Sequence, residues 1–446
     1  MVIPTLLIAL ILALTTVVAL IHHRDTFHPA LLIVPMLAFF YCYWPAMLEA
    51  TGGFYGYLWD EHVARAQWIH LAGVLGICAG LVIGSAGAVR STASPLAYSG
   101  YFDRKTLLWA SIIFGMLGLW SFSYQIVNVG GFSQAYGRAY GGGYIESGYV
   151  REITVLALPA LLLLTLGRRS GPMTLRELGL MLACASPFLI HGLLGGRRGP
   201  TFVGLVGPVM VFYMSRNKRP RLATVLAGGL LLGVLMLALV SNRSRIYWGA
   251  DMDLDASPTD YLRPGAGNDF IYAAGLAVVM DETQDFAWGT NYLTMLFVRP
   301  IPRAIWPTKY EDAARFFDRP NMEQNLGVDI QAFRYILGWD AAVGAAPGVI
   351  GDMFREFSWG MPLAMLTLGW FYGYAWRRGI GSQGAWLPVY CLLTSLSLYL
   401  IMQSLEAMLY RFLLAVPPMV LALRLARRTA VHAAAKPESV ERLENA

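Results

Sequence analysis

The sequence predicts an all-helical, polytopic membrane protein with about eleven transmembrane helices and a large helical external loop between the eighth and the ninth. Hydrophobic residues make up 56% of the 446 residues and charged residues only 14%, whereas soluble globular proteins carry roughly 25% charged residues. Apolar runs of about 17–25 residues, long enough to cross the hydrocarbon core of a bilayer, recur along the chain. The segments that connect these runs differ strongly in their content of Lys and Arg, which orients the chain.

Eight of the predicted spans precede residue 241, and three follow residue 360. In order they are Val2–Ile21, Ala30–Pro45, Trp68–Val89, Leu107–Val129, Ile153–Leu166, Leu178–Leu194, Thr201–Met214, Leu222–Val240, Met361–Trp376, Ala385–Met402 and Ala407–Leu423. The first has no positive residue before it and is followed by His22, His23 and Arg24, so we expect an uncleaved span with its N-terminus outside. Thr201–Met214 is short for a span, and we expect it to include the arginine-containing turn before it or to line a cavity.

Basic residues alternate between the two sides of the predicted topology. The connections on one side, together with the C-terminal tail, hold eighteen of the 34 Lys and Arg residues. The short connections and adjoining span ends on the opposite side hold six. Because Lys and Arg collect in cytoplasmic loops, we expect the C-terminus in the cytoplasm. Removing or adding one span would destroy the alternation, so the charge pattern favours eleven spans.

Four consecutive regions follow from this topology. Residues 1–240 form the first eight helices, residues 241–346 an external cap with short helices, residues 347–423 a re-entrant or broken segment with the last three spans, and residues 424–446 a cytoplasmic tail. The cap holds fourteen of the 28 acidic residues, and a structureless loop of this length would be unusual. Within the cap, we expect Asp269 to cap a helix over Phe270–Met280, and Trp288–Val298 is apolar enough to lie at the membrane interface.

Several functional classes are excluded by the absence of their motifs. The chain contains no P-loop sequence, and Gly141-Gly142-Gly143 lacks the strand and helix of a dinucleotide fold. Histidines are not spaced as metal ligands, so no metal site and no cofactor are expected. The four cysteines lie in or at the ends of apolar runs and form no disulfide framework. The net charge of +6 comes without a basic stripe and interleaved aromatic residues, so we expect no nucleic-acid partner.

The turn Gly195-Gly196-Arg197-Arg198-Gly199-Pro200 is the most informative short segment. Two adjacent arginines in a short connection are typical of the cytoplasmic side, but the predicted topology places this turn outside. The turn contains no acid, and Pro200 is expected to begin the next helix, whose N-terminal amides add partial positive charge. We interpret the turn as a binding site for an anionic ligand.

Other arginines on the expected external side favour the same kind of ligand, because guanidinium matches phosphate oxygens and stays charged. The alternative is that these arginines pair with acids of their own loop. The Gly- and Tyr-rich segment before residue 150 suggests flat faces for sugar rings, although Tyr and Trp collect at membrane interfaces in any membrane protein. The candidate substrate-binding residues are Arg197, Arg198, Arg299, Arg303, Arg334, Arg355, Tyr140 and Tyr144.

Acidic residues are candidates for a general base that removes the proton of a sugar hydroxyl. Such a base should lie near the membrane and close to a bound phosphate. Asp352 and Glu356, which flank Arg355, fit this role best, and Asp340 comes next. Glu406 precedes the last span and has Arg411 as an alternative partner.

Three segments resemble the Wzy-type polymerases of O-antigen and exopolysaccharide repeat units. They are Gly195–Pro200 at the start of a span, Arg299–Lys309 (RPIPRAIWPTK), and Gly351–Gly360 (GDMFREFSWG). The last is similar to a G-E-x-[YF]…F-G pattern of that family, with Asp352 at the acidic position and Trp359 inserted before Gly360. The number of spans and the large late external loop resemble the family over nearly the whole chain.

The resemblance implies a bacterial inner-membrane glycosyltransferase with a fold related to the O-antigen ligases. Such enzymes act outside the cytoplasmic membrane on undecaprenyl-diphosphate-linked glycans and need no metal or nucleotide sugar. A chain-length regulator and a flippase are the protein partners that it implies. In this reading arginines neutralise the leaving diphosphate, an acid takes the acceptor proton, and the external cap aligns both glycans.

Two alternatives remain open at the level of sequence. An O-antigen ligase, which transfers a finished glycan to the lipid A core, shares the same architecture. A transporter or flippase of lipid-linked oligosaccharide would favour inverted repeats, broken helices and charges in the middle of spans. The sequence shows no repeat, and its spans are almost free of charge, which favours chemistry at the membrane surface over translocation.

Overall fold

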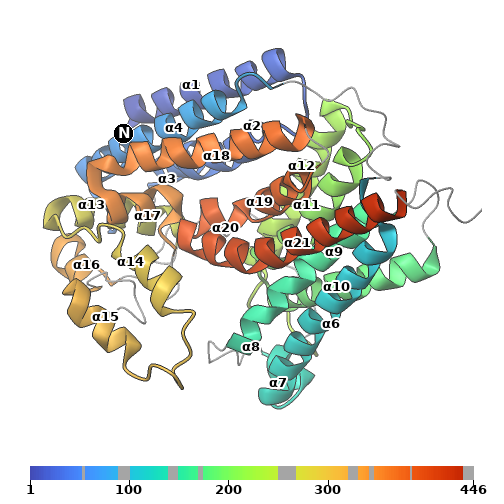
Figure 1. Cartoon of the computed structure of the whole chain (residues 1–446). Helices are drawn as coiled ribbons and strands as arrows, with labels where there is room; N and C mark the ends of the chain where they lie inside the picture. Colours follow the sequence, from blue (N-terminus) through green and yellow to red (C-terminus); the bar gives the residue numbers. More distant parts are fainter. Residues whose placement is uncertain are drawn as a thin grey trace, which may run out of the picture. The chain divides into compact units, whose positions relative to one another are not determined.

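The computed structural model describes residues 1–52, 56–88, 101–138, 149–168, 174–249, 268–319, 330–340, 346–381 and 384–434 (Figure 1). These residues form helices and turns, and they contain no strand. The all-helical prediction is confirmed for them.

In the described part of the chain, seven helices are long and apolar enough to cross a membrane. They span Val2–His23, Ala30–Ala50, Asp60–Ser85, Arg104–Asn128, Val150–Gly167, Leu222–Ser241 and Leu405–Thr429. Each overlaps a span predicted from the sequence, although the bounds differ by up to eight residues at one end, as for Asp60–Ser85 against the predicted Trp68–Val89. The other four predicted spans are helical as well: α10 (Leu175–Leu193), α11 (Arg198–Met214), α18 (Met361–Gly381), and the successive shorter helices α19 (Trp386–Ser395) and α20 (Ser397–Met402). The number of helices that cross the membrane therefore stays a prediction.

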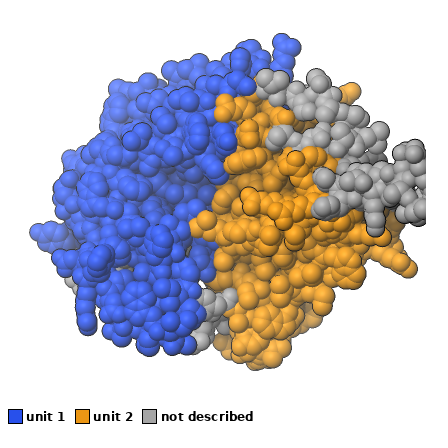
Figure 2. All heavy atoms as spheres, in the orientation of Figure 1, with its two compact units in different colours: residues 1–87, 256–374, 396–410 blue, residues 88–255, 375–395, 411–446 orange. Residues whose placement is uncertain are grey.

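The chain divides into two compact units, each built from three separate stretches (Figure 2). Unit 1 comprises residues 1–87, 256–374 and 396–410, and unit 2 comprises residues 88–255, 375–395 and 411–446. The helices of unit 1 that precede residue 88 are α1 (Val2–Val18) with η1 (Ala19–His23), α2 (Ala30–Ala38) with η2 (Phe39–Tyr43), α3 (Trp44–Ala50) and α4 (Asp60–Ser85). Those after residue 256 are α13 (Asp269–Thr283), α14 (Thr290–Leu293) with η5 (Thr294–Val298), α15 (Lys309–Phe317), α16 (Ile330–Leu337), α17 (Gly348–Phe357) with η6 (Ser358–Gly360), and α18 to Tyr374.

Helix α4 is the packing centre of unit 1, and it contacts α1, α13 and α17. Its partner α18 approaches very closely along a row of glycines. A Cβ atom on Gly76, Gly80 or Gly84 would overlap the backbone of Pro362, Leu366 or Trp370, respectively. Small residues such as glycine allow helix backbones to approach each other this closely.

Helix α13 forms a buried layer of unit 1, since all its residues from Asp269 to Met280 except Tyr272 are buried. The prediction that Asp269 caps this helix is wrong. The cap is Asn268, whose Oδ1 accepts hydrogen bonds from the backbone amides of Phe270 and Ile271, at 3.0 and 3.2 Å. Asn268 holds the extended backbone that an N-cap residue requires, and Asp269 is already the first helical residue.

Unit 2 packs its helices around α9, which is buried from Ala157 to Leu166. Helices α6, α10, α11 and α19 all contact α9. The elements of unit 2 are α6 (Arg104–Asn128), α7 (Phe132–Tyr136), α8 (Tyr149–Glu152), η3 (Ile153–Leu156), α9 (Ala157–Gly167), α10, α11, α12 (Leu222–Ser241), α19, and α21 (Leu405–Ala434) from Arg411 onward. Helix α10 begins with a reciprocal capping box between Thr174 and Glu177.

Candidate functional site

The arginine turn connects α10 to α11 within unit 2. Helix α11 begins at Arg198, with Arg197 as its N-cap residue, so the short predicted span does include part of the turn. Gly196 adopts a left-handed conformation (φ 57°), and a Cβ atom there would lie 2.6 Å from Cβ of Arg243. Only glycine lets the turn pack against Arg243 in this way.

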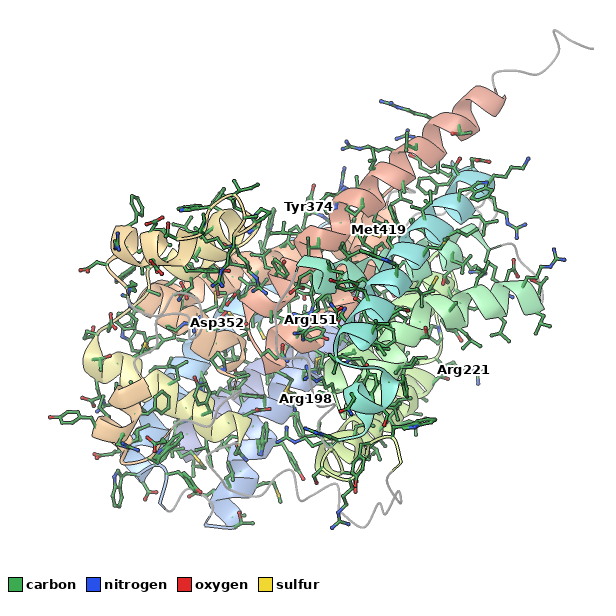
Figure 3. All side chains as sticks on the ribbon, turned by 90° about the horizontal axis from the view of Figure 1, so that it is seen from below. Arg151, Arg198, Arg221, Asp352, Tyr374 and Met419 are labelled. Carbon is green, nitrogen blue, oxygen red and sulfur yellow. The ribbon has the colours of Figure 1, made fainter. Side chains whose placement is uncertain are left out.

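His191, near the end of α10, experiences the positive charges of Arg197, Arg151 and Arg411. The Tyr136 hydroxyl lies 3.4 Å from its Nδ1 atom. These arginines come from the start of α11, from α8 and from α21, which lie far apart in the sequence (Figure 3 labels Arg151 and Arg198). Unit 2 therefore concentrates positive charge beside the N-terminus of a 17-residue helix.

The acids favoured from the sequence lie in unit 1, in a buried network centred on α17 (Asp352 is labelled in Figure 3). The Arg355 guanidinium contacts Asp352 Oδ1 at 2.7 Å and Glu356 Oε1 at 3.1 Å. Asp352 Oδ2 also accepts hydrogen bonds from the Tyr292 hydroxyl at 2.7 Å and from the backbone amide of Leu405 at 3.0 Å. Asp352 and Glu356 are both 0% exposed, so both carboxylates are enclosed by protein.

The ionisation of this network follows from its burial. Burial, together with the negative charge of Asp352, raises the pKa of Glu356 above its ordinary value, although Arg355 opposes this shift. Burial also raises the pKa of Tyr292, and so does the adjacent Asp352 carboxylate. Burial by itself lowers the pKa of Arg355, but the carboxylates of Asp352 and Glu356 outweigh it and hold that pKa above its ordinary value.

A second ion pair of unit 1 is more open than this network. Arg299 Nη1 lies 3.6 Å from Glu406 Oε1, and the Arg299 guanidinium stacks over the Tyr410 ring at 4.2 Å. The Arg299 side chain is 34% exposed. The sequence offered Arg411 as a partner for Glu406, but the structure pairs Glu406 with Arg299, from a distant part of the chain.

Lys309 holds the segment that carries Arg299. Its ammonium group donates hydrogen bonds to the carbonyl oxygens of Val298, Arg299 and Ile301, at 3.2, 2.9 and 2.6 Å. The residue is only 2% exposed. Sequence reasoning did not assign Lys309 a role, although it is the only lysine in the predicted cap.

The remaining predicted residues are not part of the buried network. Asp340 forms an exposed ion pair with Arg334 at 2.6 Å, and the Arg303 guanidinium lies 5.6 Å from the Tyr310 ring. Tyr140 and Tyr144 lie outside the described residues. The structure thus brings together Asp352, Arg355 and Glu356 and keeps Asp340 apart from them on the surface.

Comparison with protein-family models, with curated proteins and with solved structures finds no match for this chain. Its fold and its charged clusters define an all-helical protein with several helices of membrane-spanning length. Unit 2 carries a cluster of arginines, and unit 1 carries a buried network of acids and arginines.

Proposed function

We propose that this protein is a glycosyltransferase of the bacterial inner membrane that polymerises undecaprenyl-diphosphate-linked oligosaccharide repeat units on the external face. The proposal includes eleven spans, an external N-terminus, a cytoplasmic C-terminus and an external cap between spans 8 and 9. The observation that carries it is the turn that places Arg197 and Arg198 at the N-terminus of α11. A diphosphate is the anion that suits such a group, because it presents several oxygens to planar, permanently charged donors.

In the proposed reaction, the bond between the anomeric carbon of the growing chain and the diphosphate oxygen breaks. The hydroxyl oxygen of an incoming repeat unit bonds to that carbon, and its proton passes to a carboxylate. The arginines stabilise the charge that develops on the diphosphate, which is the largest electrostatic demand of the reaction. We assign this role to Arg197 and Arg198.

We assign the proton acceptor to Glu406 instead of Asp352, Glu356 or Asp340. Asp352 and Glu356 are completely enclosed and are committed to Arg355, so we give them a supporting role. Asp340 forms a short ion pair with Arg334, at 2.6 Å, whereas the pair of Glu406 with Arg299 is looser, at 3.6 Å. Glu406 lies beside the partly exposed Arg299 and directly after Leu405, whose amide is fixed by Asp352.

The test is the chain length of surface polysaccharide in a strain that lacks the gene. The strain is complemented with the native protein, with Arg197→Ala/Arg198→Ala, or with Arg424→Ala/Arg428→Ala, a matched control that removes the same charge from exposed positions of α21. We expect single-repeat glycans in the deletion strain and in the first variant, and long chains with the native protein and the control.

The outcomes separate the alternative functions. Long chains without the gene contradict the proposal. Loss of even single-repeat material from the surface indicates transport, which a flippase would perform. In the deletion strain, long chains that accumulate on the lipid carrier and are not transferred to the lipid A core would indicate that the protein is a ligase. A chain-length regulator and a flippase are the partners that a polymerase would need.

A further inference from the structure

The segment Trp288–Val298 of unit 1 exposes only apolar side chains. Its exposed residues are Trp288, Leu293 and Phe297, at 66%, 43% and 67%, respectively. Leu293 and Phe297 are four residues apart in the continuous helical segment formed by α14 and η5, so both side chains lie on the same face. Contiguous exposed apolar surface is unusual on a side that faces water, and it marks a site of interaction.

Trp359 of η6 belongs to the same region of unit 1, because two buried phenylalanines connect it to Trp288. The ring centre of Phe286 lies 5.9 Å from that of Trp288 and 5.4 Å from that of Phe354. The ring centre of Phe354 lies 5.7 Å from that of Trp359, which is 56% exposed. The two exposed tryptophans therefore flank one buried pair of phenylalanine rings.

The backbone is strained at both tryptophans. Trp288 adopts a left-handed conformation (φ 52°), and so does Ser358, directly before Trp359. This conformation is uncommon for residues other than glycine and is an outlier for a bulky one. Strain of this kind persists where the surrounding structure imposes it, and it is frequent at functional sites. Here the strained turns hold two indole rings that the protein itself leaves mostly uncovered.

Helix α4 shows which side of unit 1 is suited to lipid. It is long and apolar enough to cross a membrane, and its exposed residues from Trp68 to Ser85 are Trp68, Leu75, Val82 and Ile83. The first three recur every seven residues and form one apolar stripe along the helix. All charged residues of α4 precede Trp68, so Trp68 marks the level at which the apolar stripe begins.

Trp359 lies close to the level of Trp68. The glycine contacts place Gly76 of α4 beside Pro362 of α18, and the two helices run in the same direction. This register brings Trp359 to the level of residue 73 of α4, which is about 8 Å along the helix from Trp68 at 1.5 Å per residue. The headgroup region on each side of a bilayer has a comparable thickness. Trp359 therefore lies at a depth that suits the membrane interface.

We propose that Trp288, Leu293, Phe297 and Trp359 form an apolar face that inserts into the headgroup region of the bilayer. Lipid is the occupant because Trp359, in this face, lies near the level at which the apolar stripe of α4 begins. In addition, Trp, Phe and Leu are the residues that typically anchor interfacial segments.

Insertion of the apolar face also sets the depth of the buried acidic network. Asn291 and Tyr292 belong to the same segment and donate hydrogen bonds to Glu356 and Asp352, respectively. Because these buried residues alternate with exposed ones, the segment contacts the network on one side and lipid on the other. The apolar face would hold the network at the membrane interface whatever reaction the protein catalyses.

The experiment measures lipid contact at single cysteines that carry a bimane label in the full-length protein. The protein is reconstituted in phosphatidylcholine vesicles with or without bromine atoms on the upper part of the acyl chains, and bromine quenches a bimane that it contacts. Leu293→Cys and Phe297→Cys should lose fluorescence in brominated vesicles to a similar extent as Leu75→Cys, which lies in the apolar stripe of α4. The labelled native protein gives the background from its own cysteines.

Tyr335→Cys is the matched control, because Tyr335 is an aromatic residue of unit 1 that is 92% exposed. Its helix, α16, is followed by Trp339, whose indole donates a hydrogen bond to the carbonyl of Tyr57 at 2.7 Å. Tyr57 precedes α4, so α16 lies near the charged end of α4 and away from its apolar stripe. A bimane on Tyr335→Cys should keep its fluorescence in brominated vesicles.

The results decide the proposal in either direction. Strong quenching of Leu293→Cys and Phe297→Cys without quenching of Tyr335→Cys supports lipid contact at the apolar face. Quenching of the first two that is no greater than that of Tyr335→Cys overturns the proposal, and the apolar face would then bind sugar rings or a second copy of the chain. All three substitutions replace exposed side chains, so the comparison does not depend on a change in the protein core.

Discussion

At the scale of single residues, Lys309 illustrates how a buried charge can serve the backbone. Its ammonium group is the shared donor for the carbonyls of residues 298, 299 and 301. These carbonyls lie at the end of the π-helical turn, where intrahelical donors are missing. Lys309 therefore fixes the backbone from which the Arg299 side chain extends, and we regard it as a positioning residue.

The substitution Lys309→Met should destabilise the protein, because methionine fills the space but donates no hydrogen bond. We expect a cost of roughly 1–3 kcal/mol for each carbonyl that finds no new donor. Chemical unfolding of the purified protein measures the effect. Lys105→Met, at an exposed position of α6, should leave the unfolding free energy nearly unchanged, and an equal loss in both variants would contradict the assigned role.

Glu406 offers a test of the proposed proton acceptor. Glu406→Gln keeps the shape of the side chain but cannot take a proton, so we expect general-base catalysis to fall by about 10²–10⁴-fold. The measurement is polysaccharide chain length in the complemented deletion strain, at matched protein levels in the membrane. Glu61→Gln changes an exposed acid of unit 1 and should support normal chains. Long chains with Glu406→Gln would assign the base elsewhere.

The buried Glu356 predicts a pH dependence of stability. Its pKa is higher in the folded protein than in the unfolded chain, because burial and Asp352 disfavour the charged form. The folded state therefore binds this proton more tightly, and the stability it contributes is present at low pH and lost as pH rises through the folded pKa. The unfolding midpoint should fall over this range. Glu356→Gln should flatten the slope, and an unchanged slope would contradict the shift.

The sequence predicted part of this residue-level arrangement. Asp352, Arg355 and Glu356 lie within one helical turn, and their mutual contact follows from that spacing. The pairing of Glu406 with Arg299 did not follow, because the two lie about a hundred positions apart and only the tertiary fold joins them. The hydrogen bond from Asn291 to Glu356 was also hidden, since a polar residue in an apolar run does not reveal which neighbour it faces.

At the scale of elements, the contact between α4 and α18 depends on glycine. Gly80→Ile would place a branched side chain against the backbone of Leu366, and we expect destabilisation of about 1–3 kcal/mol or more. The control is Gly229→Ile in α12, where a Cβ atom meets no other atom within 4 Å. Unfolding in detergent compares the two variants. A similar loss of unfolding free energy in both variants would mean that intrinsic helix propensity, and not packing against α18, causes the destabilisation.

The glycine spacing was readable in the sequence. Gly76, Gly80 and Gly84 recur every fourth residue, which places them on one face of a helix and is typical of close helix contacts in membranes. The identity of the partner was not readable, because α18 lies nearly three hundred residues later. Element boundaries were predicted more easily, since apolar runs and capping residues are local features, although Asn268 was missed beside the more acidic Asp269.

At the scale of the whole molecule, the proposed orientation can be tested with single cysteines. Ile305→Cys lies at an exposed position in the expected external cap, and Arg176→Cys lies at an exposed position in an expected cytoplasmic connection. In intact spheroplasts, a membrane-impermeant maleimide should label the first and reach the second only after permeabilisation. Three of the four native cysteines are buried and the other is partly buried, so the background should be low. The reverse pattern would contradict the orientation.

The division into units has a consequence for biosynthesis. The glycine face of α4 emerges from the ribosome long before α18, which is synthesised nearly three hundred residues later. At about 5–20 residues per second, α4 waits on the order of tens of seconds for its partner. Another early helix or the insertion machinery should therefore cover the glycine face during translation. The core of unit 1 is completed only after its last stretch, residues 396–410, has been synthesised.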